Sequence, residues 1–382
     1  MKSDKTTPNV PTLRFAEFTD EWEKYELSHF VTRITRRNKN NESSLPLTIS
    51  AQYGLVDQIS FFNKTVASVD LSGYYLLYNG DFAYNKSYSN EYAWGAVKRL
   101  DKYEKGCLSS LYFVFRPNDN VDSDYLTHYF ESSKWHKGIS NIAGEGARNH
   151  GLLNMAVDDY FATKHYLPSL PEQKKIARIF NAITKRIEIQ NKIISKYETL
   201  IKGICCYMVK KANSNIYKLG MLTDIYQPMT IAKTDLPDDG IYPVYGANGI
   251  IGYSNQYNHK ESQKLITCRG STCGTVNLSA QYSWITGNSM VINIEKHKNL
   301  VDKKYLYYYL KTLSFNNLIS GSGQPQIIRK PFVTLDVRLP SLSQQIKYRE
   351  IIDTFEKALK NEEEMLSDLQ MQKTFLLQSM FI

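Results

Sequence analysis

The chain has 382 residues, a formal net charge of +9 at pH 7 and a hydrophobic content of 42%. This length predicts two or three domains, and the composition is that of an ordinary globular protein rather than a disordered one. No apolar run is long enough for a membrane span, and the polar N-terminus lacks an apolar signal core, so we expect a cytoplasmic protein. The positive charge fits a polyanionic partner without proving one.

The five cysteines argue against a secreted disulfide framework and against a zinc site. Their number is odd and their spacing is irregular, so we expect free thiols in a reducing compartment. No CxxC pair and no histidine at ligand spacing accompanies them, and we predict no metal site. They are Cys107, Cys205, Cys206, Cys268 and Cys273.

Residues 1–20 are predicted to form a short N-terminal arm, because Pro8 and Pro11 interrupt regular structure. Three apolar side chains of the arm are expected to dock onto a neighbouring element of the fold. They are Leu13, Phe15 and Phe18.

A first globular module is predicted over residues 21–166. Segments rich in β-branched and aromatic residues predict strands, and Asn79-Gly80 predicts a hairpin turn between two of them. A helix is expected over residues 123–133, with Asp122 or Ser123 as its N-cap. A polar Gly-x-Gly loop follows at residues 144–149. The strands are predicted at residues 45–50, 74–78, 81–85 and 111–115.

Residues 167–211 predict one long helix. Pro171 suits its first turn, where a missing N–H costs nothing, and no other proline follows before Lys211. Apolar residues recur in steps of three and four, which is the spacing of one helix face. About 39 residues at 1.5 Å each would give a rod of roughly 60 Å. The segment opens with Leu167-Pro168-Ser169-Leu170-Pro171-Glu172-Gln173.

The same plan returns in the second half of the chain. A second module, residues 212–338, repeats the order of the first, with a strand at 264–268, a helix at 302–311 and a Gly-rich loop at 321–326. A second long helix, residues 339–382, opens with Leu339-Pro340-Ser341-Leu342-Ser343-Gln344-Gln345, which matches the first opening after a shift of 172 residues. Two unrelated amphipathic helices would not share an opening, a register and a length.

We expect the two helices to pair in an antiparallel coiled coil, because a whole module joins the end of one to the start of the other. Residues 171–211 carry ten Lys or Arg and three Asp or Glu, whereas residues 343–382 carry five and seven. This difference in charge favours their pairing. The predicted seam consists of Ile183, Ile187, Ile194, Ile201 and Ile204 from the first helix and Phe355, Leu359, Leu366 and Leu376 from the second.

The predicted fold is therefore α+β: two similar mixed α/β modules separated by two long antiparallel helices, as a pseudo-twofold repeat. The modules share order but little identity, which favours a variable specificity located in their loops. Arginine pairs with guanine, and asparagine or glutamine with adenine, so polar loop residues are candidates for base contacts. A cluster of cations at residues 33–39 is a candidate for phosphate contacts, with a solvated loop face as the alternative. The DNA-binding candidates are Arg33, Arg36, Arg37, Lys39, Lys86, Arg148, Asn149, Arg269, Gln324, Gln326, Arg329 and Lys330.

Signatures of catalysis are missing from the sequence. There is no methyltransferase Asn-Pro-Pro-Tyr motif, no Walker loop and no HExxH, and Gly144-x-Gly146 lacks the third glycine of a dinucleotide loop. We therefore expect a non-catalytic recognition scaffold. Two other hypotheses remain open: a coiled-coil adaptor that binds only proteins, and a nuclease that acts alone.

The arrangement resembles the specificity subunit of Type I restriction–modification enzymes. The resemblance covers nearly the whole chain, and its best markers are the two Leu-Pro-x-Leu-x-x-Gln segments at 167–173 and 339–345. Residues 11–15, Trp22 and residues 373–381 also look like that family, as does the Gly-rich loop at 321–327. The first module departs from the family where Ala147-Arg148-Asn149-His150 replaces the Gln-Pro-Gln form.

The resemblance implies that each module is a target recognition domain for one half of a bipartite site in double-stranded DNA. It implies that the helices set the spacer and dock two modification subunits, which bring S-adenosylmethionine and methylate adenine. Restriction subunits, which use ATP and Mg, would join to translocate and cut. This chain itself would bind no cofactor.

Overall fold

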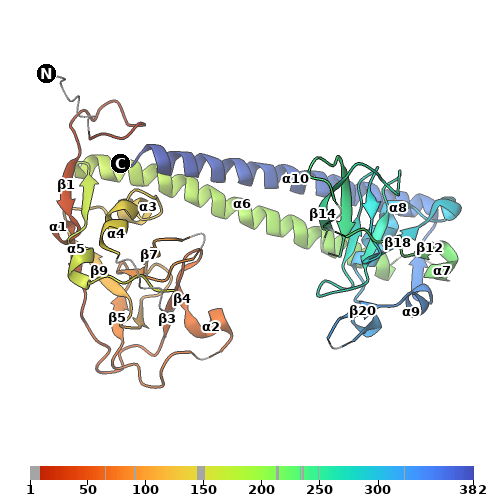
Figure 1. Ribbon diagram of the computed structural model, residues 1–382, viewed down its shortest axis with the longest axis horizontal. Coiled ribbons are helices and arrows are strands. Elements are labelled where there is room, and N and C mark those ends of the chain that lie inside the picture. Colours follow the sequence, from red (N-terminus) through yellow and green to blue (C-terminus); the bar gives the residue numbers. More distant parts are fainter. Residues whose placement is uncertain are drawn as a thin grey trace. The chain divides into compact units, whose positions relative to one another are not determined.

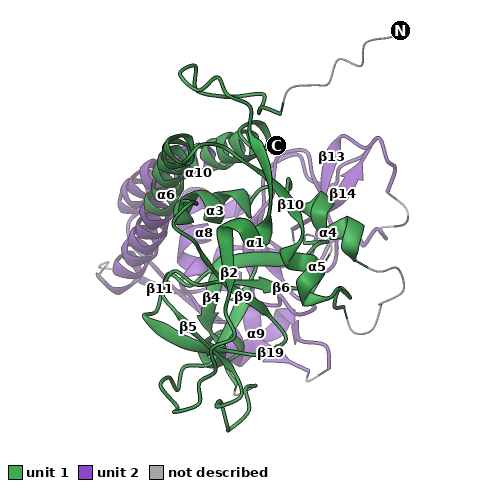
Figure 2. Ribbon diagram, turned by 90° about the vertical axis from the view of Figure 1, so that its left-hand side faces the viewer, with its two compact units in different colours: residues 1–190, 365–382 green, residues 191–364 purple. Residues whose placement is uncertain are grey.

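The computed structural model describes residues 9–64, 66–89, 92–143, 151–211, 215–232, 234, 236–247, 249–321 and 323–382. The chain divides into two compact units, residues 1–190 with 365–382 (unit 1) and residues 191–364 (unit 2), coloured separately in Figure 2. Each unit combines one module, the start of the long helix that follows it, and the end of the other long helix.

Unit 1 holds the first module, whose elements are labelled in Figure 1. Its strands are β1 (Glu23–Glu26), β2 (Val31–Arg33), β3 (Leu47–Ser50), β4 (Gly54–Asp57), β5 (Tyr75–Tyr78), β6 (Phe82–Asn85), β7 (Ala96–Arg99), β8 (Lys105–Leu108), β9 (Phe113–Pro117) and β10 (Lys164–Leu167). Its short helices are α1 (Leu27–Phe30), α2 (Gln58–Phe62), α3 (Ser123–Tyr129), α4 (His136–Ile142) and α5 (Val157–Phe161). The central sheet is antiparallel in the order β2-β9-β6-β7, while β3-β4, β5-β8 and β1-β10 form separate pairs.

The four expected strands occur as β3, β5, β6 and β9, each beginning one or two residues later than predicted. The hairpin predicted at Asn79-Gly80 is wrong. A tight turn does form there, because the Asp81 N–H donates to the Tyr78 carbonyl and Gly80 has a φ of 87°. However, β5 pairs with β8, and β6 pairs with β7 and β9. The turn therefore passes the chain from one sheet to another.

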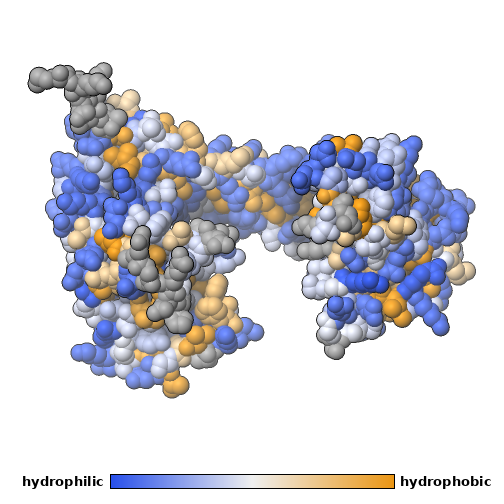
Figure 3. Space-filling view, viewed as in Figure 1, coloured by the Kyte–Doolittle hydropathy of each residue, from blue (hydrophilic) through white to orange (hydrophobic). Residues whose placement is uncertain are grey.

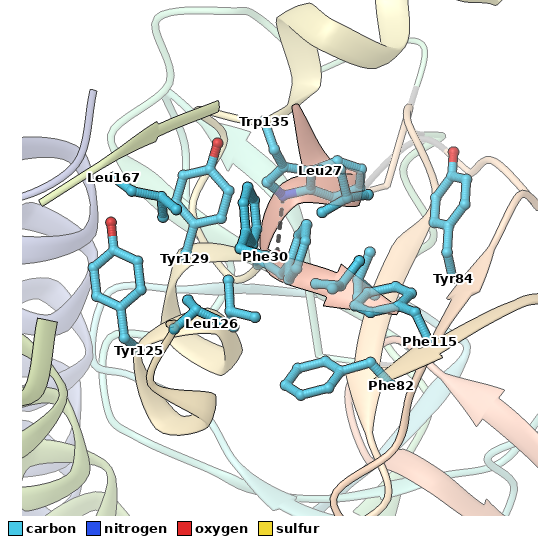
Figure 4. Packing of buried hydrophobic residues seen from close by; sticks show 14 of the residues in the cluster. Leu27, Phe30, Phe82, Tyr84, Phe115, Tyr125, Leu126, Tyr129, Trp135 and Leu167 are labelled. Carbon is cyan, nitrogen blue, oxygen red and sulfur yellow. Dashed lines mark hydrogen bonds between the residues drawn. The ribbon is translucent and has the colours of Figure 1, made fainter. Parts of the chain in front are cut away.

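The core of unit 1 lies between its central sheet and its helices, as Figure 4 shows for part of the cluster. Phe82 and Phe115 stack from neighbouring strands with ring centroids 5.5 Å apart. Tyr125, Leu126 and Tyr129 line the buried face of α3. Full burial of such a side chain contributes about 1.5–3 kcal/mol, so this cluster fixes the sheet against the helices.

Helix α3 is capped as expected, because the Asp122 side chain accepts a hydrogen bond from the Tyr125 N–H. It ends at Tyr129 rather than at residue 133, so the predicted end is wrong. The Ser132 N–H donates to the carbonyls of His128 and Tyr129, and the Ser132 hydroxyl donates to the Tyr129 carbonyl. These bonds satisfy the last carbonyls of the helix and close it.

Unit 2 repeats this plan. Its strands are β11 (Asn215–Lys218), β12 (Asp224–Tyr226), β13 (Tyr242–Gly246), β14 (Gly249–Ser254), β15 (Lys264–Thr267), β16 (Val276–Leu278), β17 (Trp284–Ile285), β18 (Ser289–Asn293), β19 (Ile319–Ser320), β20 (Gln326–Ile327) and β21 (Asp336–Leu339). Its helices are α7 (Leu219–Leu222), α8 (Lys303–Lys311) and α9 (Arg329–Val333), with 3-10 turns at Glu295–His297 and Asn316–Leu318. The central sheet has the order β12-β18-β15-β16, which matches β2-β9-β6-β7 of unit 1 strand for strand.

The two long helices are α6 (Leu170–Lys211) and α10 (Leu342–Ser379). In unit 1, the rings of Phe180 and Phe381 stack with centroids 5.5 Å apart. In unit 2, the rings of Tyr197 and Phe355 lie 6.3 Å apart. The start of α6 thus meets the end of the chain, whereas later residues of α6 meet earlier residues of α10. The expected α+β fold with two similar modules and two antiparallel helices is confirmed.

All nine predicted seam residues are half-buried. Ile183 and Leu376 pack against the unit 1 core, and Ile201 and Ile204 pack against the unit 2 core. The ends of the helices therefore serve two purposes: they contact each other, and they close the hydrophobic core of a module.

In each Leu-Pro-x-Leu-x-x-Gln segment, the buried glutamine side chain forms two hydrogen bonds that join two parts of the fold. Gln173 Oε1 accepts from the Asp122 N–H at 2.8 Å, and its Nε2 donates to the Pro168 carbonyl at 2.9 Å. Gln345 does the same with the Asp302 N–H and the Pro340 carbonyl, at 2.9 Å each. Each glutamine thus ties the start of a long helix to the cap of the module's helix, α3 or α8.

The N-terminal arm packs on the helix ends of unit 1. The Leu13 N–H donates to the Ser379 carbonyl, and the Phe15 ring packs against the core. The Arg14 guanidinium grips the Glu172 carboxylate with two bonds of 2.8 Å, and the Trp22 indole N–H donates to the same group at 3.4 Å. The arm therefore covers a carboxylate in the first turn of α6, where the helix dipole also favours negative charge.

Candidate nucleic-acid interface

The cluster of cations at residues 33–39 does not form one phosphate-facing surface. Arg36 Nη2 lies 2.9 Å from Asp81 Oδ2, and its Nε donates to the Leu76 carbonyl at 3.1 Å. Arg116 Nε binds the other oxygen of Asp81 at 2.6 Å, and the Asp81 side chain is fully buried. Arg36 and Arg116 therefore neutralise a buried carboxylate, and the sequence did not indicate Arg116 because β9 brings it there.

The other members of this cluster differ in their surroundings. The Arg37 guanidinium donates to the Gly73 carbonyl at 2.6 Å and lies 4.2 Å from the centre of the Tyr75 ring. Arg33 is exposed, 3.8 Å from Asp158, and Lys39 is exposed as well. Arg33 and Lys39 are thus the two members whose charge faces solvent.

Lys86 faces inward. Its Nζ lies 4.7 Å from the centre of the Phe113 ring, and burial lowers the pKa of its ammonium group. Arg148 and Asn149, the remaining candidates of the first module, lie outside the described residues.

In unit 2 the structure brings two candidates together. An isolated antiparallel bridge pairs Arg269, just after β15, with Gln326, the first residue of β20. Both side chains are exposed, and so is Gln324. The loop between β19 and β20 requires glycine at its start, because Gly321 has a φ of 90° and a Cβ there would meet the Gln324 carbonyl oxygen at 2.6 Å.

The two candidates in α9 have different environments. Arg329 Nε donates to the Ile225 carbonyl of β12 at 2.6 Å, so this guanidinium holds the edge of the sheet. Lys330 is exposed. A charged residue near a glycine-rich loop therefore does not by itself predict an available contact.

Sequence reasoning missed an exposed aromatic group in unit 1. The rings of Tyr53 and Phe61 lie 6.4 Å apart, those of Phe61 and Phe62 lie 5.0 Å apart, and all three side chains are exposed. Because α2 has only five residues, its apolar residues show no periodicity that would distinguish exposed from buried positions.

Exposed apolar residues also occur along the long helices, and Figure 3 shows hydrophobic residues among hydrophilic ones on the helix surfaces that face the viewer. Leu200 and Tyr207 of α6 are exposed in unit 2, as are Met371 and Phe375 of α10 in unit 1. A long helix that leaves such residues uncovered offers contact area to a partner.

The buried His165 side chain forms hydrogen bonds within its own module. His165 is held between the Tyr129 hydroxyl and the Thr163 hydroxyl, each at 2.8 Å, and burial lowers its pKa to about 4. Among the described residues, no group of His, Cys, Asp and Glu is arranged to hold a metal ion. The helices within that same part of the chain include none that is long and apolar enough to cross a membrane.

The sequence profile of the Type I restriction modification DNA specificity domain matches residues 20–199 and 212–370. The chain belongs to this family. The resemblance drawn from the sequence is therefore confirmed, and each copy of the specificity domain includes one module and much of the long helix that follows it.

Curated relatives carry matching names over shorter stretches. The specificity subunit of the Type I restriction enzyme EcoprrI from Escherichia coli is 28% identical over 116 residues, which are 30% of this chain and 28% of that protein. A putative type I restriction enzyme specificity subunit from Haemophilus influenzae is 29% identical over 125 residues, or 32% of this chain and 31% of that protein. The matched stretches thus span less than a third of these relatives.

Two solved structures share the fold. The S subunit of a Type-I restriction-modification system from M. genitalium has a TM-score of 0.62 and 16% identity, over 98% of this chain and 99% of that one. A chain from a structure of the type I R-M system, solved to explain complex assembly and conformational transition, has a TM-score of 0.57 and 17% identity, over 94% and 97%. The fold of this chain is thus one that sequences with little identity adopt.

Proposed function

We propose that this chain is the non-catalytic specificity subunit of a Type I restriction–modification complex. Each module reads one half of a bipartite site in double-stranded DNA, and α6 and α10 set the length of the spacer between the halves. The observation that carries this proposal is the duplication: two specificity domains with the same sheet order and the same glutamine bridge, but with different surface residues.

Two readers of different sequences should differ in the side chains that contact the bases. Phosphate contacts supply affinity, whereas side chains at base edges supply sequence specificity. The two modules share the hydrogen bonds that pair their central strands, but they carry different side chains at equivalent exposed positions. This is expected for two readers of different half-sites. Candidate phosphate contacts are the exposed Arg33, Lys39 and Lys330.

The proposal assigns the chemistry to partner chains. Two modification subunits would bring S-adenosylmethionine and methylate adenine, and restriction subunits would bring ATP and Mg. The exposed apolar residues of the helices, such as Leu200 and Phe375, are candidates for docking the modification subunits.

The methylome of a cell that carries this chain and its modification subunits tests the proposal directly. The expected result is one bipartite motif with two short half-sites and an unspecified spacer of fixed length. Methylation of a continuous motif, or none beyond that of cells without the chain, would contradict it. Cleavage of DNA by the purified chain alone would instead favour a nuclease.

The role of the helices has a sharper test. Deleting seven residues from both α6 and α10 keeps the seam in register and shortens each helix by about 10 Å, or about three base pairs of DNA. The spacer should then shorten while both half-sites stay the same. The control replaces exposed residues of the same segments by alanine at constant length, and a spacer that is unchanged by the deletions would show that the helices do not set it.

A further inference from the structure

In each unit, one extended segment lies beside the continuation of a central strand at an isolated antiparallel bridge. In unit 2 the bridge joins Arg269 and Gln326. Its flanking hydrogen bonds run from the Gly270 N–H to the Pro325 carbonyl and from the Ile327 N–H to the Cys268 carbonyl, both at 3.0 Å. Arg269 and Gln326 are therefore a non-hydrogen-bonded pair, the kind in which opposite Cα atoms lie only about 4.5 Å apart and both side chains leave the same face.

Unit 1 contains the same backbone arrangement with different side chains. Its bridge joins Ser87 and Leu152, and it is flanked by hydrogen bonds from the Tyr88 N–H to the Gly151 carbonyl and from the Leu153 N–H to the Lys86 carbonyl.

The sheet register shows that the two bridges are equivalent. Phe82 of β6 pairs with Phe115, which pairs with Arg33, the third residue after α1. Lys264 of β15 pairs with Ile292, which pairs with Ile225, the third residue after α7. Ser87 and Arg269 both follow five residues later. The two modules thus present unrelated side chains at one shared position.

The side chains of Arg269 and Gln326 are available for contacts. Both residues are exposed, and within the described part of the chain no hydrogen bond or ion pair involves the guanidinium of Arg269 or the amide group of Gln326. This distinguishes Arg269 from Arg36 and Arg329, whose guanidinium groups bind main-chain carbonyls of their own module. The backbone beneath the pair is also anchored, because the Ser320 hydroxyl donates to the Gln326 carbonyl at 3.4 Å.

We propose that Arg269 and Gln326 read two neighbouring base pairs of one half-site, Arg269 a guanine and Gln326 an adenine. The proposal rests on the proposed function and names the residues through which one module recognises DNA. Arginine can donate two hydrogen bonds to guanine O6 and N7, and glutamine can both accept from adenine N6 and donate to adenine N7 in the major groove. Two long side chains whose Cα atoms lie about 4.5 Å apart can reach base pairs stacked about 3.4 Å apart.

The equivalent pair in unit 1 cannot do this. Leu152 has no polar side-chain atom, and the Ser87 hydroxyl is a single short group. The half-site read by the first module therefore should not depend on a bidentate pair at this bridge. This difference makes Ser87 and Leu152 matched controls at the same place in the fold.

The test uses the full chain in complex with its modification subunits. The wild-type bipartite motif is first defined by methylome sequencing. Methylation rates are then measured on duplexes in which each base pair of both half-sites is changed in turn. The variants are Arg269→Ala, Gln326→Ala, the control Ser87→Ala, and Lys330→Ala as an exposed cation of the same module.

The expected result is that each of the first two variants loses discrimination at one base pair, a guanine for Arg269→Ala and the adjacent adenine for Gln326→Ala. The loss should be about 5- to 150-fold at that position. The other half-site and the spacer should stay unchanged, which also shows that the variant chain is folded and assembled. Ser87→Ala should leave discrimination at every base pair of the first module's half-site unchanged, and Lys330→Ala should weaken methylation of all sequences alike.

Three outcomes would overturn this inference and leave the proposed function standing: a uniform loss over all duplexes, which indicates phosphate contacts, no change at all, or relaxed positions that are not adjacent. A wild-type complex that methylates no bipartite motif would overturn the proposed function, and this inference with it.

Discussion

The two modules share their main-chain pairing and differ in the side chains that pack on it. In both, a strand before the first short helix pairs with the strand that leads into the long helix, in the same register at Glu23–Leu167 and Asn215–Leu339. In both, a central sheet of four strands has the same order, and an aspartate caps the helix that follows it. Main-chain hydrogen bonds and the two glutamine bridges are thus the constant part of the design.

Equivalent positions of the two central sheets carry very different side chains. In unit 1, Phe82 lies beside Arg99, whose guanidinium reaches Asp124 at 2.7 Å. The equivalent residues in unit 2 are Lys264 of β15 and Leu278 of β16. The cation therefore lies on β15 in unit 2, whereas in unit 1 it lies on β7, the strand paired with β6. Arg99 has an acidic partner, whereas Lys264 is fully buried and its Nζ has no hydrogen-bond partner among the described residues.

The first turns of α6 and α10 also differ in the burial of an equivalent side chain. Glu172 in unit 1 is buried beneath the N-terminal arm, whereas its equivalent in unit 2, Gln344, is exposed. Hydrogen bonds between backbone segments therefore hold both modules in the same arrangement, while individual side chains differ with what covers each module. This can be tested by substitutions made at equivalent positions in both units.

The largest effect is expected from Arg14→Ala. It leaves the Glu172 carboxylate buried without its cation, and the loss of one partner of a buried pair costs about 3–5 kcal/mol. Hydrogen exchange should report faster opening of α3 and the start of α6, with α8 unaffected. Gln344→Ala, at the position of unit 2 that corresponds to Glu172, is the control and should change stability by less than about 0.5 kcal/mol. Similar effects of the two substitutions would show that the arm does not distinguish the units.

Next come Gln173→Ala and Gln345→Ala, which should destabilise their own units by similar amounts. Each substitution leaves the half-buried N–H of an N-cap aspartate and a proline carbonyl without their partner, at a cost of about 1–3 kcal/mol. Gln345→Ala also removes a bond to the Leu300 carbonyl. Exchange rates in α3 and α8 would measure the two effects separately. If only one of the two glutamines affects its unit, the bridges are not equivalent parts of a repeated frame.

An effect of similar size and opposite sign is expected from Lys264→Met. Burial lowers the pKa of Lys264 to about 7. The unfolded chain therefore binds more protons than the folded one from about pH 7 up to the ordinary lysine pKa of about 10.4, and stability should rise with pH across that window. Below it the amine is charged in both states, and the penalty for burying the charge is fully present.

Lys264→Met should therefore stabilise unit 2 at pH 7 by about 1–3 kcal/mol and abolish the rise between pH 7 and 10. Denaturant unfolding at several pH values measures both effects, with the exposed Lys330→Met as the control. A pH dependence that persists in Lys264→Met would show that another group causes it.

Local patterns predicted much of this architecture. The spacing of apolar residues predicted α6 and α10, and the repeated Leu-Pro-Ser-Leu opening predicted their equivalence, because helix periodicity depends only on near neighbours. The cap at Asp122 followed from the same kind of local rule. The four strands predicted in the first module were found within two residues for the same reason, whereas other strands of that module, such as β7 and β8, were not predicted.

Pairing between strands that are distant in the sequence could not be predicted. Asn79-Gly80 carries a strong hairpin signal, yet β5 and β6 belong to different sheets because each finds a better partner elsewhere in the chain. The candidate cations show the same limit. Arg36 and Arg329 bind carbonyl groups of their own modules, and only the fold shows that the Arg269 guanidinium remains available.

Local sequence patterns were enough to predict two modules and two long helices, each helix following its module through a Leu-Pro-x-Leu-x-x-Gln segment. Such patterns reflect the steric and solvation preferences of neighbouring residues. Which side chains bind groups of their own module, and which remain available to a partner, followed only from the three-dimensional fold. That choice depends on contacts between residues far apart in the chain, as at the bridge between Arg269 and Gln326.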